Sequence, residues 1–521
     1  MENNYEWLPH LDNSIPISAY GYKLCIYTIA LEGWRRGLKV KFFNVYRKEK
    51  GETKLTVRFS LTSKNTEHTF AVSRGDLVNK QAISVCVDKD LTKKYLSTAG
   101  VDVPLGKSFT HTDSDEVIIK YFKSLNFPVV LKPTDAGGGK GVITNINSVE
   151  DLKQALLHVR TDLNYKNVIL ERYIAGEDHR VYVIGNRVIG VYKRIPANVI
   201  GDGKRTISEL IDVKNNLRKK NPYLAGRLIK KDKEMENFMN LKGLSLKDIP
   251  KVNERVFVRE KGSLSAGGEP IDVTDQIPQK AKDTAIAAAK AIPNLPQCAV
   301  DMIIEKDTGI GFVNEVNSKP QISNHLYPVE GKARDIPKAI IDYYFPETIE
   351  EGFRNDLIYF DFDSILPPLR NGQVQEITYP SLEKEDFIIK KIEMTGSFKK
   401  IKYKKLLKKQ ALNLKLHGFI KGNANNISIV ISGKKDNIKR FITELRKYFS
   451  SDVTFKELEW RKPVKAGFEV VQDKVVSAKR NNKEIEAIKR KYESIENSTF
   501  WKMTKPVRVI ADSFKSSGKK K

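Results

Sequence analysis

Three segments of this 521-residue chain contain residue types that could bind phosphate, a nucleotide and a divalent metal. The first, FPVVLKPTDAGGGKGV (127–142), is a strand-like run that carries Lys132, followed by the glycine run Gly137 to Gly141, which Lys140 interrupts. Backbone N–H groups of a glycine loop, together with an ammonium, can hold phosphates. A glycine cluster alone is more often a turn, so this segment needs support from the others.

The second segment, VILERYIAGEDHRVYVIGNRVIGVYKR (168–194), reads as a strand that ends near Glu171 and is followed by a second pair of strands. Between them lie Tyr173 and Ile174, and then Glu177 and Asp178. Backbone groups in such a stretch can hydrogen-bond adenine, and a carboxylate can hold ribose hydroxyls. The alternative is an ordinary surface turn between two strands.

The third segment, CAVDMIIEKDTGIGFVNEVNSKP (298–320), reads as a β-hairpin with Asp301 in its first strand. Glu315 and Asn317 lie in the second strand and face the same side, because strand side chains alternate. Carboxylate and amide oxygens suit Mg²⁺ carried with phosphates. A solvated acidic hairpin is the alternative.

In this order, the three segments resemble the ATP-grasp superfamily, and within it the ligase domains of cyanophycin synthetase and of bifunctional glutathione synthetase. The resemblance covers residues 86–347 and extends to RIPANVIGDGKRTISELI (194–211), SLSAGGEPIDVTDQI (263–277) and HLYPVEGKARDI (325–336). It implies an ATP-dependent carboxylate–amine ligase that forms an acyl phosphate and then an amide. The implied cofactors are ATP and two Mg²⁺ ions, with Mn²⁺ as a substitute.

The resemblance also implies roles for single residues. Ala299 stands where some related ligases carry an arginine, so Arg194 or Arg259 would supply that charge. The implied nucleotide contacts are Lys89, Lys132, Gly138, Gly139, Lys140, Gly141, Glu171, Tyr173, Ile174 and Asp178. The implied metal ligands are Asp301, Glu315 and Asn317, and Lys193 and Arg194 would face the reacting phosphate or carboxylate. The candidate substrate contacts are Ser265, Gly267, Gly268, Arg259, His325 and Arg334, for which turn glycines and surface arginines are the alternative.

The elements that must position these residues predict an α/β and α+β chain of several domains. A helix over 24–36 and strands over 39–46 and 54–61 indicate an N-terminal lobe at 1–85. The ATP-grasp domain spans 86–347 and includes a charged helical insertion at 204–250. A linker at 348–385 precedes a strand-helix-strand-strand-helix-strand unit at 386–460, and a basic helical tail spans 461–521.

The 386–460 unit has the ferredoxin-like order and resembles acylphosphatase in residues 391–460. Lys404 stands at the family's phosphate-binding arginine, and Gly422 stands at its catalytic asparagine. Lysine lacks the bidentate fork of arginine, and glycine has no side chain to orient water, so we expect no acylphosphatase turnover. Anion binding through Lys399, Lys400, Lys402 and Lys404 is one role left open, and a scaffold for dimerisation or polymer binding is the other.

The net charge of +27 favours acidic partners, without choosing among them. An anionic polymer or a membrane surface at the basic C-terminal region fits this charge, whereas nucleic acid is disfavoured because no reading motif is present. Three cysteines without short spacing, no secretory start and no long apolar run indicate a cytoplasmic protein, which could sit at the inner face of the membrane. Two other function classes stay open, a polyanion- or membrane-binding adaptor with a nucleotide-responsive core and a small-molecule kinase. A homo-oligomer is also compatible with the sequence.

Overall fold

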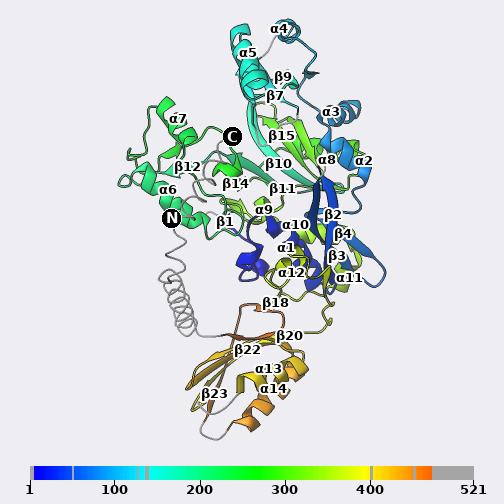
Figure 1. Cartoon of the computed structure of the whole chain (residues 1–521), viewed down its shortest axis with the longest axis vertical. Coiled ribbons are helices and arrows are strands. Elements are labelled where there is room, and N and C mark those ends of the chain that lie inside the picture. The colour runs from blue at the N-terminus through cyan, green and yellow to red at the C-terminus, as the bar shows by residue number, and fades with distance from the viewer. Residues whose placement is uncertain are drawn as a thin grey trace, which may run out of the picture. The chain divides into compact units, whose positions relative to one another are not determined.

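The computed structural model describes residues 5–49, 52–125, 128–134, 140–398, 403–449 and 453–471, and it divides the chain into unit 1 (1–384) and unit 2 (385–521) (Figure 1). The Gly137–Gly139 part of the glycine loop, the Lys399, Lys400 and Lys402 positions and the tail after residue 471 lie outside the described residues. The mixed α/β and α+β class predicted from the sequence is confirmed. No helix in the described ranges is both long and apolar enough to cross a bilayer.

The N-terminal lobe is a five-stranded sheet in the order β19-β2-β3-β4-β5, and α1 packs against it. The predicted helix and the two predicted strands are confirmed as α1, β2 and β3. The bounds are α1 Leu24–Arg35, β2 Lys39–Glu49, β3 Glu52–Thr62, β4 Glu67–Ala71, β5 Arg74–Gly75, β18 Ile358–Tyr359, α12 Leu366–Arg370 and β19 Glu376–Tyr379. Segment 348–385 therefore returns to this lobe, where Phe360 and Phe362 contact the ring of Tyr27 edge-on.

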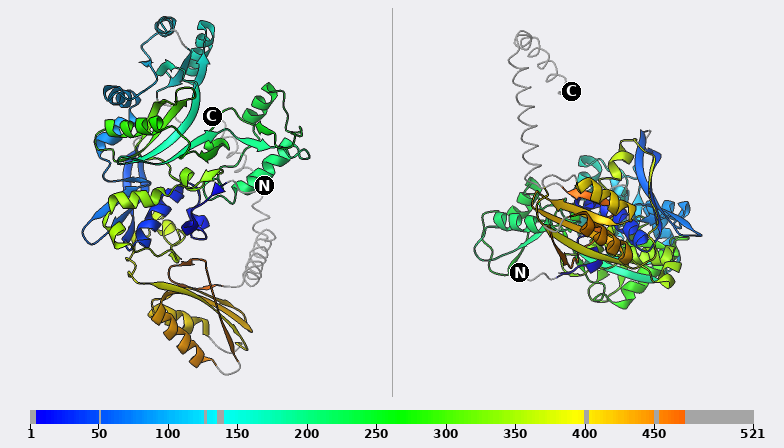
Figure 2. Two further views of the ribbon diagram at one scale, coloured as in Figure 1. Left: turned by 180° about the vertical axis from the view of Figure 1, so that it is seen from behind. Right: turned by 90° about the horizontal axis from the view of Figure 1, so that it is seen from below.

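The second sheet is four-stranded and antiparallel, in the order β6-β9-β7-β8. Phe109, Leu131 and Leu170 of the sheet share a core with Ile118 and Leu152 of the helices α4 and α5. These helices lie at the top of Figure 1 and of the left view of Figure 2. The bounds are β6 Gly106–Phe109, α4 Asp115–Lys123, β7 Val129–Pro133, β8 Ile143–Ile146, α5 Val149–Leu156, a π-helical turn Leu157–Asp162 and β9 Val168–Arg172.

The third sheet is five-stranded and antiparallel, in the order β14-β11-β10-β15-β16. One face is apolar, with Val181, Val191 and Val300 packed against helices that include α8, and the opposite face carries charged side chains. The predicted hairpin at 298–320 is confirmed as β15 and β16. The bounds are α2 Lys80–Val87, α3 Lys89–Thr98, β10 Gly176–Ile184, β11 Arg187–Ile195, β14 Glu269–Asp272, α8 Gln279–Ala291, β15 Gln297–Glu305 and β16 Gly311–Asn317.

Residues 198–257 branch from the end of β11 and fold around a small core of their own. Leu210 and Ile211 of α6 pack there with Met235 and Met239 of α7. A capping box begins α6, since the Thr206 side chain accepts from the N–H of Glu209 and the Glu209 carboxylate accepts from the N–H of Thr206. The bounds are β12 Asn198–Ile200, α6 Ile207–Arg218, α7 Lys233–Leu241 and β13 Arg255–Phe257.

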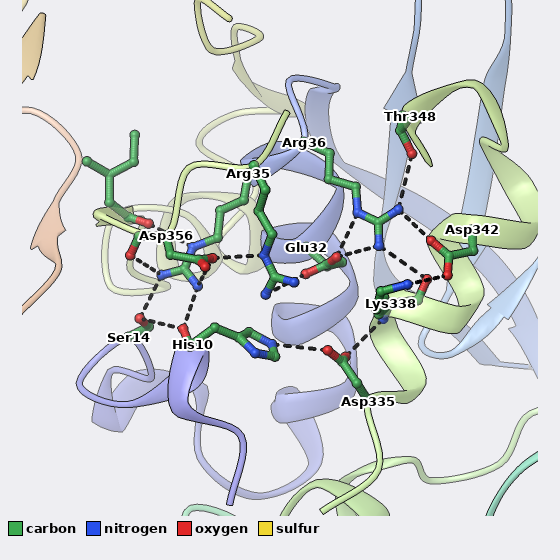
Figure 3. Close-up of polar contacts among 12 residues, drawn as sticks. His10, Ser14, Glu32, Arg35, Arg36, Asp335, Lys338, Asp342, Thr348 and Asp356 are labelled. Atoms are coloured by element: carbon green, nitrogen blue, oxygen red, sulfur yellow. Dashed lines mark hydrogen bonds and ion pairs between the residues drawn. The ribbon is translucent and has the colours of Figure 1, made fainter. Parts of the chain in front are cut away.

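Buried charges join the N-terminal lobe to α10 (Figure 3). Arg36 binds Glu32 at 2.7 Å and Asp342 of α10 at 2.7 Å. Arg35 is fully buried and donates to the carbonyl of His10 at 2.7 Å. The remaining elements of unit 1 are β1 Tyr5–Glu6, the 3₁₀ turns Pro9–Leu11, Ile17–Ala19, Gly21–Lys23 and Leu264–Ala266, α9 Ser323–Leu326, β17 Gly331–Lys332, α10 Ile336–Tyr344 and α11 Glu347–Glu351.

Unit 2 contains a sheet in the order β23-β20-β22-β21-β25, with α13 and α14 packed on it. Its first four strands have the ferredoxin-like order that the sequence predicts, and β25 adds a fifth strand parallel to β21. Ile392, Ile429 and Phe441 are at the centre of its core. The bounds are β20 Phe387–Thr395, α13 Tyr403–Asn413, β21 His417–Gly422, β22 Asn426–Lys434, α14 Lys435–Tyr448, β23 Thr454–Leu458, β24 Val464–Lys465 and β25 Phe468–Val471.

Candidate active site

Asp301 is the centre of a charged cluster on the polar face of the third sheet. It lies opposite Arg180 in the register of β10 and β15, and the two form a bidentate pair with both distances at 2.5 Å. Arg194 of β11 adds two contacts to Asp301 at 3.2 Å and binds Asp178 at 2.8 Å. Burial alone would raise the pKa of Asp301. The two guanidinium groups nevertheless lower this pKa below its ordinary value. The carboxylate is therefore charged at neutral pH.

Glu315 and Asn317 lie on the same face as Asp301. Glu315 is directly opposite Asp301 in the register of β15 and β16, and Asn317 is two residues further along the strand. Within the described ranges, no three His, Cys, Asp or Glu side chains are grouped so that they could hold a metal ion. Two carboxylates and one amide match a Mg²⁺ ion that takes its other oxygens from a nucleotide. The amide nitrogen of Asn317 is buried without a hydrogen bond to the described residues, so it is a donor available to an oxygen atom of a ligand.

A second charged cluster lies on the four-stranded sheet. Lys132 of β7 binds the Glu171 carboxylate of β9 at 2.5 Å, and Lys93 of α3 contacts the same carboxylate. Burial, with the like charges of Lys93 and Lys89, lowers the pKa of Lys132 to about 7 even though Glu171 lies against it. Burial likewise lowers the pKa of Lys93 to about 8. Two partly buried ammonium groups on one carboxylate leave an excess of positive charge, which suits a polyphosphate.

The lysine cluster lies close enough to the third sheet for Lys132 to interact electrostatically with it. The charge of Glu315, on the third sheet, acts on Lys132 and opposes the lowering of its pKa. Only residues 173–175 separate β9 of one sheet from β10 of the other. In this short link Ile174 is buried, and the N–H of Tyr173 donates to the carbonyl of Pro128 at 2.7 Å. A Cβ at Gly176 would lie 2.2 Å from the carbonyl oxygen of Ile304, so the link turns tightly against β15.

The structure separates some residues that the sequence groups together. Lys193 and Arg194 point to opposite faces of β11, and Lys193 binds the exposed Glu177 at 3.3 Å. Arg259 is buried against α7, where it binds Asp232 at 2.6 Å and Glu234 at 2.9 Å. Of the three candidate catalytic side chains, only Arg194 lies in the Asp301 cluster. Residues 135–139 of the glycine loop lie outside the described residues. The structure resumes at Lys140, which is exposed, and at Gly141, whose φ is +67°.

The candidate substrate residues fall into two groups. The first group is a tight loop. A Cβ at Gly267, whose φ is +98°, would lie 2.8 Å from Ile229, and a Cβ at Gly268 would lie 2.8 Å from the carbonyl of Ser263. Ser265 hydrogen-bonds Ser263 at 2.9 Å. Close packing of the loop therefore explains why glycine occupies these two positions. In the second group are His325 and Arg334, which lie beside β11.

His325 is buried between the rings of Tyr182 and Tyr192, at 5.8 and 4.9 Å between centroids. Neither of its ring nitrogens has a hydrogen bond to the described residues, and burial lowers its pKa to about 3. The backbone N–H of Arg334 donates to the backbone carbonyl of His325, and the Arg334 side chain binds Asp272 and Asp275 at 2.7 Å each. The imidazole is thus neutral and lies behind Tyr192, on the side of the sheet that carries Arg194.

Two residues of the clusters were missed by the sequence reasoning. Lys93 follows Lys89 by one helical turn in α3, and this i, i+4 spacing could have identified it. Arg180 follows Asp178 by two residues in β10, and strand alternation could have placed it on the same face. Both spacings are also common at exposed, solvated positions, so neither is specific for a binding site.

A lysine cluster on one sheet, an acidic and arginine cluster on a second sheet and a three-residue link between them form a candidate site for a nucleotide and its metal ion. Residues 97–211 match the family described as D-ala D-ala ligase C-terminus, and residues 390–470 match Acylphosphatase.

Among curated proteins, the chain is 34% identical over 267 residues to the Glutathione biosynthesis bifunctional protein GshAB of Clostridium perfringens, covering 50% of this chain and 34% of that protein. It is 34% identical over 272 residues to Cyanophycin synthetase of Crocosphaera subtropica, covering 51% of this chain and 31% of that protein. Among solved structures, a bifunctional glutathione synthetase from Pasteurella multocida is 26% identical, with a TM-score of 0.45 and coverage of 56% of this chain and 40% of that chain.

The chain is therefore similar to these ligases over about half of its length and carries an acylphosphatase-like unit after that region. It spans about a third of the length of the two curated relatives, at 34% and 31%.

Proposed function

We propose that this protein is an ATP-dependent ligase that joins a carboxylate to an amine through an acyl phosphate. The observation that carries the proposal is a pair of charged clusters on sheets that only residues 173–175 connect. Lys132 and Lys93 share the Glu171 carboxylate on one sheet, and Asp301 lies opposite Glu315 on the other. The homology to ligases gives the reaction class. The substrate class we propose is an amino acid, a peptide or an anionic polymer.

In the proposed first step, an oxygen of the substrate carboxylate attacks the γ-phosphorus of ATP, and the bond to the β-phosphate oxygen breaks to release ADP. Lys132 and Lys93 hold the phosphate charge, and their low pKa values favour contact with an anion that replaces lost solvation. Mg²⁺ bound by Asp301, Glu315 and Asn317 would supply further charge neutralisation. Arg180 and Arg194, which contact Asp301, would orient the substrate carboxylate.

In the second step, the amine nitrogen attacks the acyl carbon, the carbon–oxygen bond to phosphate breaks, and the amine gives up a proton. The products are an amide and inorganic phosphate. His325, the histidine among the candidate substrate residues, does not accept this proton in our proposal, because the rings of Tyr182 and Tyr192 enclose it.

The test measures ADP and phosphate release with a pool of candidate acids and amines, and mass spectrometry identifies any amide. We expect Asp301→Asn and Glu315→Gln each to lower amine-dependent ADP release by about 100-fold or more, as removal of a charge-stabilising group does elsewhere. Asp307→Asn is the matched control, because Asp307 is exposed in the turn between the same two strands. Full activity in the first two variants would exclude the proposal.

Hydroxylamine added in place of the amine separates this function from its alternatives. An acyl phosphate gives a hydroxamate, whereas a kinase gives a stable phosphoester. An adaptor with a nucleotide-responsive core would bind ATP and show neither product.

A further inference from the structure

A pocket of about 570 Å³ lies between the 198–257 branch and the strands β14 and β1, away from the lysine cluster. Figure 1 shows α6, β12, β14 and β1 gathered around this part of unit 1. The volume is in the range of pockets that hold a small organic molecule. None of the candidate nucleotide or metal contacts lines this pocket.

Most of the wall of the pocket is apolar. Val199, Leu210 and Leu224 line it and are buried. The rings of Tyr5 and Trp7 stack on each other at 4.5 Å and form another part of the wall. Such a surface favours an aliphatic or aromatic group over water.

The polar part of the wall has more positive than negative charge. Lys214 binds the buried Glu269 carboxylate at 2.9 Å, and Arg218 lies 3.7 Å from the same carboxylate. The Nη1 atom of Arg218 is buried and has no hydrogen-bond partner among the described residues. Burial lowers the pKa values of Lys214 and Arg218, even though the Glu269 carboxylate acts to raise both.

Two further cations, Lys220 and Arg255, line the pocket and are exposed. No ion pair holds either of them in the part of the chain that the structure describes. The charge of Arg255 reaches Lys214 and contributes to lowering its pKa. Glu330 is the second carboxylate of the lining, beside Glu269. Four cations therefore face two carboxylates, and an anionic group of a ligand would balance the excess positive charge.

The pocket is separate from the candidate active site. Ile195 lines the pocket, and Arg194, its neighbour in β11, binds Asp301. Consecutive strand residues face opposite sides of a sheet, so the two sites lie on opposite faces. Ile271 and Glu269 of β14 are also on the pocket side, paired with Lys193 and Ile195.

We propose that this pocket is a second ligand site, which binds a small apolar molecule with one anionic group such as a carboxylate. The apolar body would fill the space between α6, Trp7 and β14, and the anionic group would lie near Arg218, Arg255 and Lys220. This proposal does not depend on the ligase activity.

The test uses the full-length protein and two fluorescent probes, the anionic 1-anilinonaphthalene-8-sulfonate and the neutral N-phenyl-1-naphthylamine. We expect one anionic probe to bind per chain, and Arg255→Ala with Lys220→Ala to weaken its affinity about tenfold while the neutral probe changes little. Both residues are exposed, so the double variant should fold. Higher salt should weaken the binding of the anionic probe and leave the binding of the neutral probe nearly unchanged.

A second variant tests the position of the site. Val213→Trp places a large side chain in the pocket from α6 and should abolish binding of both probes. Leu241→Trp is the matched control, because Leu241 is 86% exposed on α7 and does not line the pocket. Asp301→Asn should leave probe binding unchanged even if it abolishes ligation, which keeps the two proposals distinguishable. Unchanged probe binding in Val213→Trp, or equal loss of both probes in the double charge variant, would overturn the inference.

Discussion

Lys132 and Lys93 are the residues of the candidate site whose charge state is set most strongly by their surroundings. Burial, together with the charges of neighbouring lysines, lowers the pKa of Lys132 to about 7 and that of Lys93 to about 8. The unfolded chain holds these protons up to about pH 10. Between pH 7 and pH 10 the unfolded state therefore binds more protons, and the free energy of unfolding contributed by these groups rises with pH.

Nucleotide binding should show the opposite dependence on pH. The phosphates need the protonated lysines, so they should raise both pKa values and take up protons on binding. We expect the Kd for ADP to rise about tenfold between pH 7.5 and 8.5. Calorimetry in two buffers of different ionisation enthalpy measures both the Kd and the proton uptake.

Lys132→Met and Lys93→Met should weaken binding at pH 7 and flatten this dependence. Lys94→Met is the control, because Lys94 is the exposed neighbour of Lys93 in α3. A Kd that stays constant across this pH range in the unmodified protein would show that the lysines do not bind the phosphates.

At this scale, the sequence could predict which residues share a strand face but not what they bind. Asp301, Glu315 and Asn317 follow from alternation within a hairpin, and the structure places them on one face. The pairing of Asp301 with Arg180 depends on the register between β10 and β15, which are more than a hundred residues apart. No local pattern specifies such a register, so the arginines that surround Asp301 could not be assigned from the sequence.

At the scale of elements, α6 depends on its capping box for a defined beginning. We expect Thr206→Ala to destabilise α6 by about 1 kcal/mol, because the N–H of Glu209 loses its acceptor at a helix end. Amide hydrogen exchange in residues 207–218 should become about fivefold faster. Since α6 also lines the second pocket, the anionic probe should bind less tightly in this variant.

Lys204→Ala is the control for this prediction, because the Lys204 side chain is exposed two residues before the cap. Exchange rates in α6 that are equal in the two variants would show that packing of Leu210 and Ile211 alone holds the helix.

Elements with a clear periodicity were predictable, and their partners in space were not. The strand pattern of 39–46 and 54–61 identified β2 and β3. The connector at 348–385 has three clustered prolines and read as a linker, yet its β19 joins the edge of the same sheet beside β2. A short edge strand separated from its partner by more than three hundred residues leaves no signal in its own sequence.

At the scale of the whole molecule, the two units have separate hydrophobic cores. The core around Ile392, Ile429 and Phe441 contains no residue of unit 1 among those described. We therefore expect two thermal transitions by calorimetry. Ile429→Ala should lower the stability of unit 2 by about 3 kcal/mol through loss of buried contacts, and Val300→Ala should lower the stability of unit 1 instead.

Nucleotide should distinguish the two transitions, because Lys132 and Lys93 of the candidate active site lie in unit 1. ADP with Mg²⁺ at about 100 times its Kd should stabilise unit 1 by about 2.7 kcal/mol and leave the transition that Ile429→Ala lowers unchanged. Unit 2 also lacks the arginine of acylphosphatases, and Lys404 donates instead to the carbonyl of Gly422 at 2.8 Å. Equal stabilisation of both transitions by ADP would contradict the prediction, and a nucleotide effect confined to unit 2 would place the phosphate site in the acylphosphatase-like domain.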